Sequence, residues 1–61
     1  MVRLTQVELQ NLRHLIEISD ILYQKFNAYS SNCVDPQIKQ MFTKAAQDSL
    51  NTKQKLLTFL N

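Results

Sequence analysis

The side chains that most often carry chemistry are scarce in this chain, which has one histidine, His14, and one cysteine, Cys33. A nucleophilic site needs a base beside the thiol and a nest of donors for the oxyanion that develops. These two residues stand at unrelated places in the sequence, and the chain has no glycine from which a tight nest could be built. The sequence therefore predicts a protein that is not an enzyme and has no catalytic residue.

Metal binding is the second chemistry to consider. His14, Glu17 and Asp20 follow one another at intervals of three and could crowd one surface in a symmetric dimer. His14, however, falls among polar residues of its helix, which is typical of a solvated surface. A two-metal site on facing helices needs inward carboxylates and imidazoles on both, and residues 36–60 contain Asp48 as their only acid and no histidine. We therefore expect no metal ligands and no cofactor.

Charge and hydropathy argue against two classes of partner. The net charge is +2, and the lysines of the second half do not line up as the stripe that phosphate binding requires. No apolar run approaches the roughly 18 residues of a membrane span, and residues 1–5 lack the layout of a signal peptide. These patterns predict a soluble, intracellular protein with no nucleic-acid or membrane partner.

One stretch, residues 30–36, separates two long segments that contain no glycine or proline. Thr5 followed by Glu8 reads as a capping box at the start of the first segment. Asp35 before Pro36 is the matching signal for the second, because Asp accepts from free amides and proline has none to leave unpaired. The sequence thus predicts an all-α fold in which one domain, residues 1–61, contains a helix over about 6–31 and another over about 36–60.

The connection between these helices is expected to be short. Asn32 is a candidate left-handed cap that would end the first helix. A turn of about three residues then follows, and short turns join antiparallel neighbours. The expected unit is an antiparallel two-helix hairpin.

Apolar residues cover about half of the circumference of each helix, which is wider than the seam that one hairpin mate needs. A chain of 61 residues also buries only roughly 60% of its unfolded surface and rarely holds a stable core alone. Both points favour self-association of two hairpins into a four-helix bundle, or a larger assembly. The residues expected to form the core and the self-association surface are Leu12, Ile16, Tyr23, Phe26, Met41, Phe42, Ala45, Ser49, Leu56 and Leu60.

Polar residues interrupt both apolar stripes: Ser19 and Ser30 in the first helix, and Ser49, Thr52 and Lys53 in the second. In the simpler interpretation the small hydroxyls bond their own i−4 carbonyls, and Lys53 extends its ammonium to water. The alternative is a central polar layer that fixes the register between hairpins, or the remains of a metal site.

The run Asp-Pro-Gln-Ile-Lys over residues 35–39 and the closing Leu-Leu-Thr-Phe-Leu over residues 56–60 resemble the second helix of small Coat F family proteins, which are spore coat proteins. Lys-Phe-Asn-Ala-Tyr over residues 25–29 resembles the end of that family's first helix. The resemblance implies a ferritin-like four-helix bundle in which a short chain contributes one hairpin. Relatives often carry inward histidines where this chain has Ser49 and Thr52, so a ligand role is not carried over.

The function expected from the resemblance is that of a non-enzymatic structural protein of the spore coat, which binds itself and other coat proteins. In an oxidised coat, Cys33 could form an intermolecular disulfide or pack as a small apolar residue. Two alternatives stay open: a small regulatory hairpin that docks on a sporulation signalling protein, although the Ser-x-x-Leu-Asp motif of such phosphatases is missing, and a residual ferritin-like metal-binding bundle.

Overall fold

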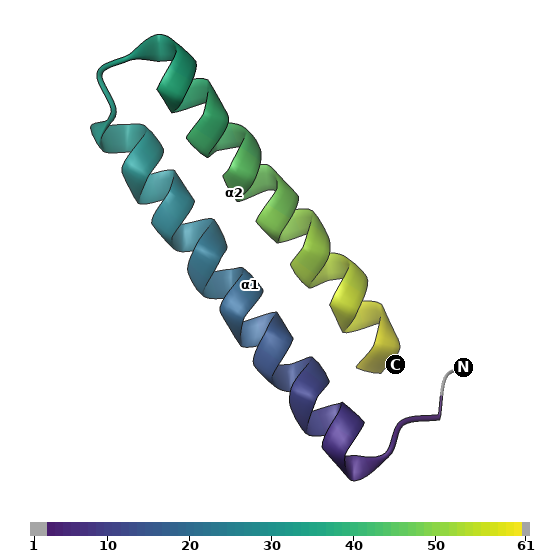
Figure 1. Cartoon of the computed structure of the whole chain (residues 1–61). Coiled ribbons are helices and arrows are strands. Elements are labelled where there is room, and N and C mark those ends of the chain that lie inside the picture. Colours follow the sequence, from purple (N-terminus) through teal and green to yellow (C-terminus); the bar gives the residue numbers. More distant parts are fainter. Residues whose placement is uncertain (1–2, 61) are drawn as a thin grey trace.

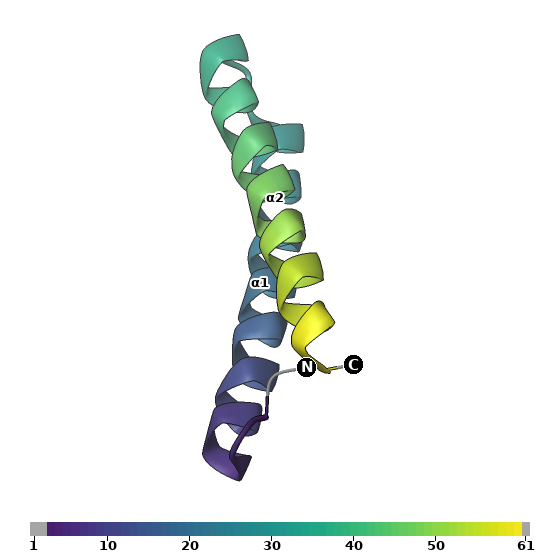
Figure 2. The same cartoon turned by 90° about the vertical axis from the view of Figure 1, so that its right-hand side faces the viewer.

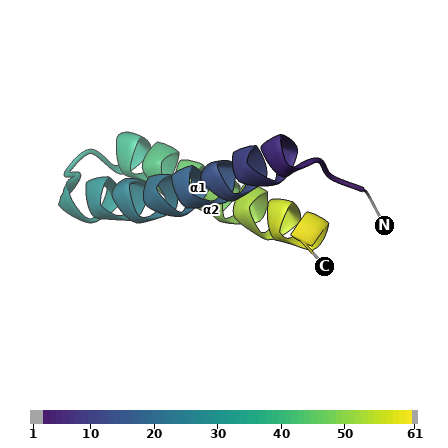
Figure 3. The ribbon, with the colours of Figure 1, turned by 90° about the horizontal axis from the view of Figure 1, so that it is seen from below.

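The computed structural model describes residues 3–60, and all regular secondary structure in that range is helical. Helix α1 spans Gln6–Asn32, helix α2 spans Pro36–Leu57, and a 3₁₀ turn, η1, follows at Thr58–Leu60. The two α-helices run antiparallel and lie side by side as one hairpin (Figure 1). Views from the side and from below show that they cross at a shallow angle and form a single layer (Figure 2, Figure 3).

Both helices begin where their sequence signals place them. The Thr5 hydroxyl accepts from the Glu8 amide at 3.1 Å, and the Glu8 carboxylate accepts from the Thr5 amide at 3.1 Å. At the second start, Asp35 accepts from the amides of Gln37 and Ile38 at 2.8 and 3.3 Å. Each cap satisfies amides that have no partner inside the helix, so the starts are fixed locally.

The helix ends differ from the expectations. Asn32 is the last helical residue of α1, not a left-handed cap, because Cys33 leaves the helix in an extended conformation with φ −87° and ψ 132°. The Asn32 side chain instead donates to the Ala28 carbonyl at 3.1 Å. Helix α2 ends at Leu57, three residues before the expected end, where the Thr58 hydroxyl donates to the Lys55 carbonyl at 2.6 Å as the chain tightens into η1.

The core is a narrow seam between the two helices. The inward residues of α1 recur at alternating steps of three and four, the spacing that keeps one stripe facing a partner helix. Leu12, Ser19, Ser30 and Ala46 are buried, and the remaining seam positions are half-buried. The half-buried residues include Ile16, Tyr23, Phe26, Phe42, Ala45, Ser49 and Leu56.

Two residues expected in the core lie outside it in the single hairpin. Met41 is 68% exposed and Leu60 is 41% exposed. Met41 precedes Phe42, whose ring does face α1, so the 100° step along the helix turns Met41 away from the seam. Leu60 lies in η1, beyond the last turn of α2.

The resulting molecule is elongated. Its extents are 45 × 16 × 12 Å and its radius of gyration is 14.2 Å, against about 10.5 Å for a compact domain of this length. Neither helix within residues 3–60 is long and apolar enough to cross a membrane.

Candidate functional site

An ion pair crosses the seam near its middle. The Nζ atom of Lys53 in α2 donates to Oδ1 of Asp20 in α1 at 2.8 Å, and the Gln24 amide donates to the other oxygen of Asp20 at 3.0 Å. The hydrogen bond from Lys53 is the main reason why the pKa of Asp20 lies below its ordinary value. Sequence reasoning placed Asp20 on the outward polar surface and directed Lys53 to water, so the structure corrects both assignments.

A second polar contact joins the helices near the turn. The Ser30 hydroxyl lies 2.7 Å from the Thr43 hydroxyl, and it also reaches the Lys39 carbonyl at 3.4 Å. Ser30 is 7% exposed, so its polar atom is satisfied inside the protein. Thr43 was not among the residues singled out from the sequence, because it lies just outside the apolar stripe of its helix.

The two contacts keep one antiparallel register. Ser30 follows Asp20 by ten residues, and Thr43 precedes Lys53 by ten residues. This spacing is the signal from which the pairs could have been found, once the three-residue turn fixes how the helices align. Ser49 behaves as the simpler interpretation predicts, because its hydroxyl donates to the Ala45 carbonyl four residues earlier at 2.9 Å.

The hairpin has two distinct sides. Both inter-helix polar contacts lie on one of them, the polar side. On the other, Leu15 of α1 and Phe59 of η1 line the same groove, together with Leu12 and Leu56 of the seam. In a pair of packed helices, side chains seven residues apart lie on the same side of the seam. Leu22 and Tyr29 therefore lie in one row with Leu15.

The apolar face is the set of exposed large apolar side chains on this second side. By the same seven-residue spacing, Ile38 and Phe59 lie in one row along α2 and η1. Ile18 lies at the outer edge of the α1 row, and Met41 lies at the outer edge of the row that contains Ile38 and Phe59. Each of these side chains is more than a third exposed. The apolar face therefore consists of Leu15, Ile18, Leu22 and Tyr29 from α1 with Ile38 and Met41 from α2 and Phe59 from η1.

An aromatic cluster anchors the apolar face at the turn end. The Tyr29 ring lies 5.4 Å from that of Phe42, and the Phe26 ring lies 6.3 Å from both, measured between ring centroids. These separations are typical of favourable aromatic pairs. Tyr29 is thus held in place by the seam while nearly half of it stays exposed.

The candidate chemical residues are not brought together. His14 and Cys33 are separated by nineteen positions of one continuous helix and its cap, or about 28 Å along the axis at 1.5 Å per residue. Cys33 is half-buried, and its thiol donates to the Asp35 carbonyl at 3.6 Å. Among residues 3–60, no group of three or more His, Cys, Asp and Glu side chains is placed to hold a metal ion.

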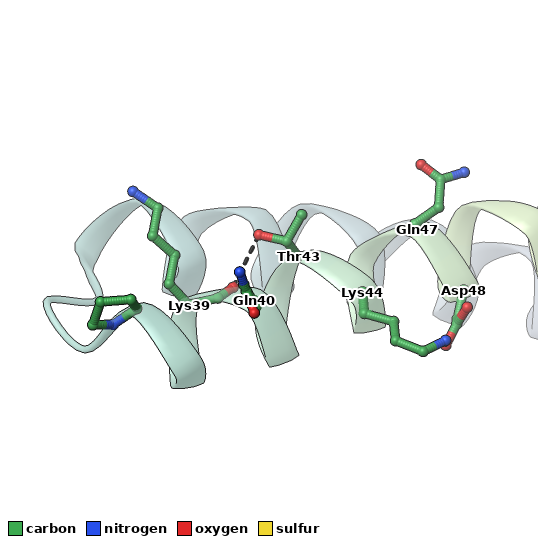
Figure 4. A pocket seen from close by; sticks show the side chains of 7 residues that line it. Lys39, Gln40, Thr43, Lys44, Gln47 and Asp48 are labelled. Atoms are coloured by element: carbon green, nitrogen blue, oxygen red, sulfur yellow. Dashed lines mark hydrogen bonds and ion pairs between the residues drawn. The ribbon is translucent and has the colours of Figure 1, made fainter.

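A shallow hollow on α2 is also visible (Figure 4). All the residues that line it come from residues 36–48 of α2 and are exposed. Apart from the contacts of Thr43 and Lys39 with Ser30, its polar contacts lie within the helix: Lys44 pairs with Asp48 at 3.4 Å, and the Thr43 hydroxyl donates to the Lys39 carbonyl at 2.9 Å. With only one helix around it, the hollow cannot enclose a ligand on several sides, as binding sites do.

Comparisons with known proteins give no relative. No protein-family model matches the chain, and no curated protein and no solved structure matches it.

Proposed function

We propose that this chain is a non-enzymatic structural protein that acts by self-association of its helical hairpin. The observation that carries the proposal is the exposed area. The hairpin leaves 5033 Å² accessible, whereas a compact monomer of this mass exposes about 4,100 Å². The excess of about 900 Å² is close to the roughly 800 Å² that each partner buries in a standard protein interface.

The nature of the exposed surface supports the same proposal. Water-facing helix surfaces carry scattered apolar residues, whereas exposed apolar residues that follow one side of a helix and extend onto its neighbour are typical of an interaction site. The apolar face extends from Leu15 and Phe59 at one end of the hairpin to Tyr29 and Ile38 at the other. A second hairpin is the partner whose length matches this row.

The narrower setting proposed for this assembly is the spore coat, with other coat proteins as further partners. The segments at residues 35–39 and 56–60, which resemble the Coat F family, are what supports it. Extraction of purified spores and of vegetative cells of the source organism, followed by mass spectrometry of both fractions, tests this setting. Enrichment in the coat fraction is expected, and a protein confined to vegetative cells would refute the spore coat assignment.

The self-association itself is tested by light scattering over a range of concentrations, with helicity followed by circular dichroism. The expected result is a helical dimer or larger species that loses helicity when dilution dissociates it, because the thin seam alone leaves much apolar surface in water. A helical monomer at every concentration would contradict self-association. That result would instead favour the second candidate, a regulatory hairpin that docks its apolar face on a signalling protein.

A further inference from the structure

We infer that two copies pair apolar face to apolar face around a two-fold axis parallel to the helices, so that both turns lie at the same end of a four-helix bundle. This inference rests on the proposed self-association and adds the surface, the symmetry and the direction of pairing. The occupant of the apolar face is therefore a second copy of this chain.

The distribution of exposed apolar residues favours a closed pair. Of the twelve exposed large apolar residues in the described part of the chain, seven form the apolar face on one side of the hairpin, and the opposite side carries the Asp20–Lys53 and Ser30–Thr43 contacts. The other five are Val7, Ile21, Val34, Leu57 and Leu60. A single self-complementary patch is buried when it pairs with the same patch of a second copy, so no patch remains for a third copy. Open filaments need two different patches. The sidedness of this hairpin therefore predicts a dimer that does not grow.

Side-chain size distinguishes the two possible axes. On the apolar face, α1 presents the large Leu22 and Tyr29, whereas α2 presents the small Thr52 at the height of Leu22 and the small Ala45 at the height of Tyr29. An axis parallel to the helices packs α1 on α2 of the partner, which sets large residues against small ones. An axis perpendicular to the helices packs α1 on α1 and α2 on α2, which crowds two Leu22 side chains and leaves the small pair poorly filled.

Charge favours the same axis. Lys25 follows Ile18 by seven residues, and Asp48 follows Met41 by seven, so both lie at the outer edge of the apolar face and at similar height. The parallel axis brings Lys25 of one copy opposite Asp48 of the other. The perpendicular axis sets the α1 edges with Lys25 on each other and the α2 edges with Asp48 on each other, and like charges on facing edges oppose association.

A distance between the two turns tests the direction of pairing. Val34 lies in the turn and is 95% exposed, so a spin label on the variant V34C, made together with C33S, disturbs neither the seam nor the apolar face. The expected label separation is below about 25 Å, because packed helices lie roughly 10 Å apart. A separation near the 45 Å length of the hairpin would overturn the parallel axis while leaving self-association intact.

Matched substitutions test the surface. Leu22→Glu and Ile21→Glu change neighbouring residues that are 39% and 51% exposed, but only Leu22 belongs to the apolar face. Leu22→Glu should weaken dimerisation at least tenfold by light scattering or sedimentation, and Ile21→Glu should change it less than threefold. Met41→Glu, at a position more exposed than either, provides a second variant that does not disturb the seam and should also weaken dimerisation.

The outcomes separate the two proposals. If the unmodified chain is a monomer, self-association fails and this inference fails with it. If the unmodified chain is a dimer and Leu22→Glu and Met41→Glu leave its dissociation constant unchanged, self-association stands and the apolar face is the wrong surface.

Discussion

Lys53 and Asp20 are 33 positions apart in the sequence, yet Nζ of one lies 2.8 Å from Oδ1 of the other across the helix seam. Lys53 occupies a seam position where an apolar residue would bury more area, and both side chains remain about a third exposed. A partly exposed ion pair adds little to stability at neutral pH. Its stronger effect is on alignment, because sliding one helix by a turn would separate the two charges.

The ion pair predicts how stability depends on acidity. The hydrogen bond from Lys53 lowers the pKa of Asp20 in the folded protein, so the unfolded chain binds more protons in this range. The contribution is present above the ordinary aspartate pKa of about 4 and is lost as the pH falls through the lowered value. Urea midpoints measured from pH 7 to pH 2 at fixed protein concentration should decline in acid, and Asp20→Asn should make that decline shallower.

Lys53→Met is the control for this assignment. It removes the donor but keeps Asp20, so the pKa of Asp20 should return toward its ordinary value in a carboxyl NMR titration. The acid decline should then resemble that of Asp20→Asn. An unchanged Asp20 pKa in Lys53→Met would contradict the proposed cause.

The contact between Ser30 and Thr43 predicts a measurable loss of stability. Ser30→Ala removes a buried hydroxyl that has two partners and should lower the free energy of unfolding by about 1–2 kcal/mol. Ser31→Ala is the matched control, because Ser31 is exposed and bonds only its own helix, at Asn27. It should change stability by less than about 0.5 kcal/mol. Equal losses in the two variants would mean that the contact across the seam contributes no more to the free energy of unfolding than a hydrogen bond within one helix.

The aromatic cluster predicts the largest effect of a single truncation. Phe26→Ala removes a half-buried ring that stacks against Phe42 and meets the edge of Tyr29. A loss of about 2 kcal/mol in a denaturant titration is expected, less than the 3 to 5 kcal/mol that a fully buried ring would cost. Phe26→Leu should lose less than about 1.5 kcal/mol because apolar contact remains. A loss below about 0.5 kcal/mol for the alanine variant would place Phe26 outside the seam.

The capping box predicts a local effect at the start of α1. Thr5→Ala removes the acceptor for the Glu8 amide and should lower stability by about 1 kcal/mol. Ser31→Ala, at an exposed position of α1 where the hydroxyl bonds only Asn27 of the same helix, is a control that removes a hydroxyl without removing a cap. Circular dichroism during thermal unfolding distinguishes them, and a Thr5→Ala midpoint equal to that of the unmodified chain would show that α1 does not depend on its cap.

Local sequence signals predicted most of the fold, since each helix start depends on residues within four positions of one another. Thr5 with Glu8 and Asp35 with Pro36 mark both starts, and the 3.6-residue period identified Leu12 and Phe26 as seam residues. Asp20 was missed because its partner comes from the other helix. Which residues meet across the seam depends on how the turn aligns the helices, and that information is spread over both.

The candidate site was predicted less well for a related reason. A half-circumference stripe predicts a second apolar neighbour for each helix, but it does not divide the stripe between the two neighbours. Met41 and Phe42 looked alike in the sequence, and only the packed pair assigns Phe42 to the seam and Met41 to the apolar face. Once the contact between the two helices of one hairpin is known, the residues proposed to face a partner copy can be distinguished from the seam residues.

The three-residue turn makes the hairpin tolerant of insertion. Asp35 caps α2 from one side of the turn, and the Ser30–Thr43 contact ties the last turn of α1 to the first half of α2, so neither helix relies on Val34. Each doubling of a flexible connection adds only about 0.6 kcal/mol of closure entropy. A peptide tag or short foreign loop placed after Val34 would therefore be displayed at the tip of the hairpin, beyond the ends of both helices.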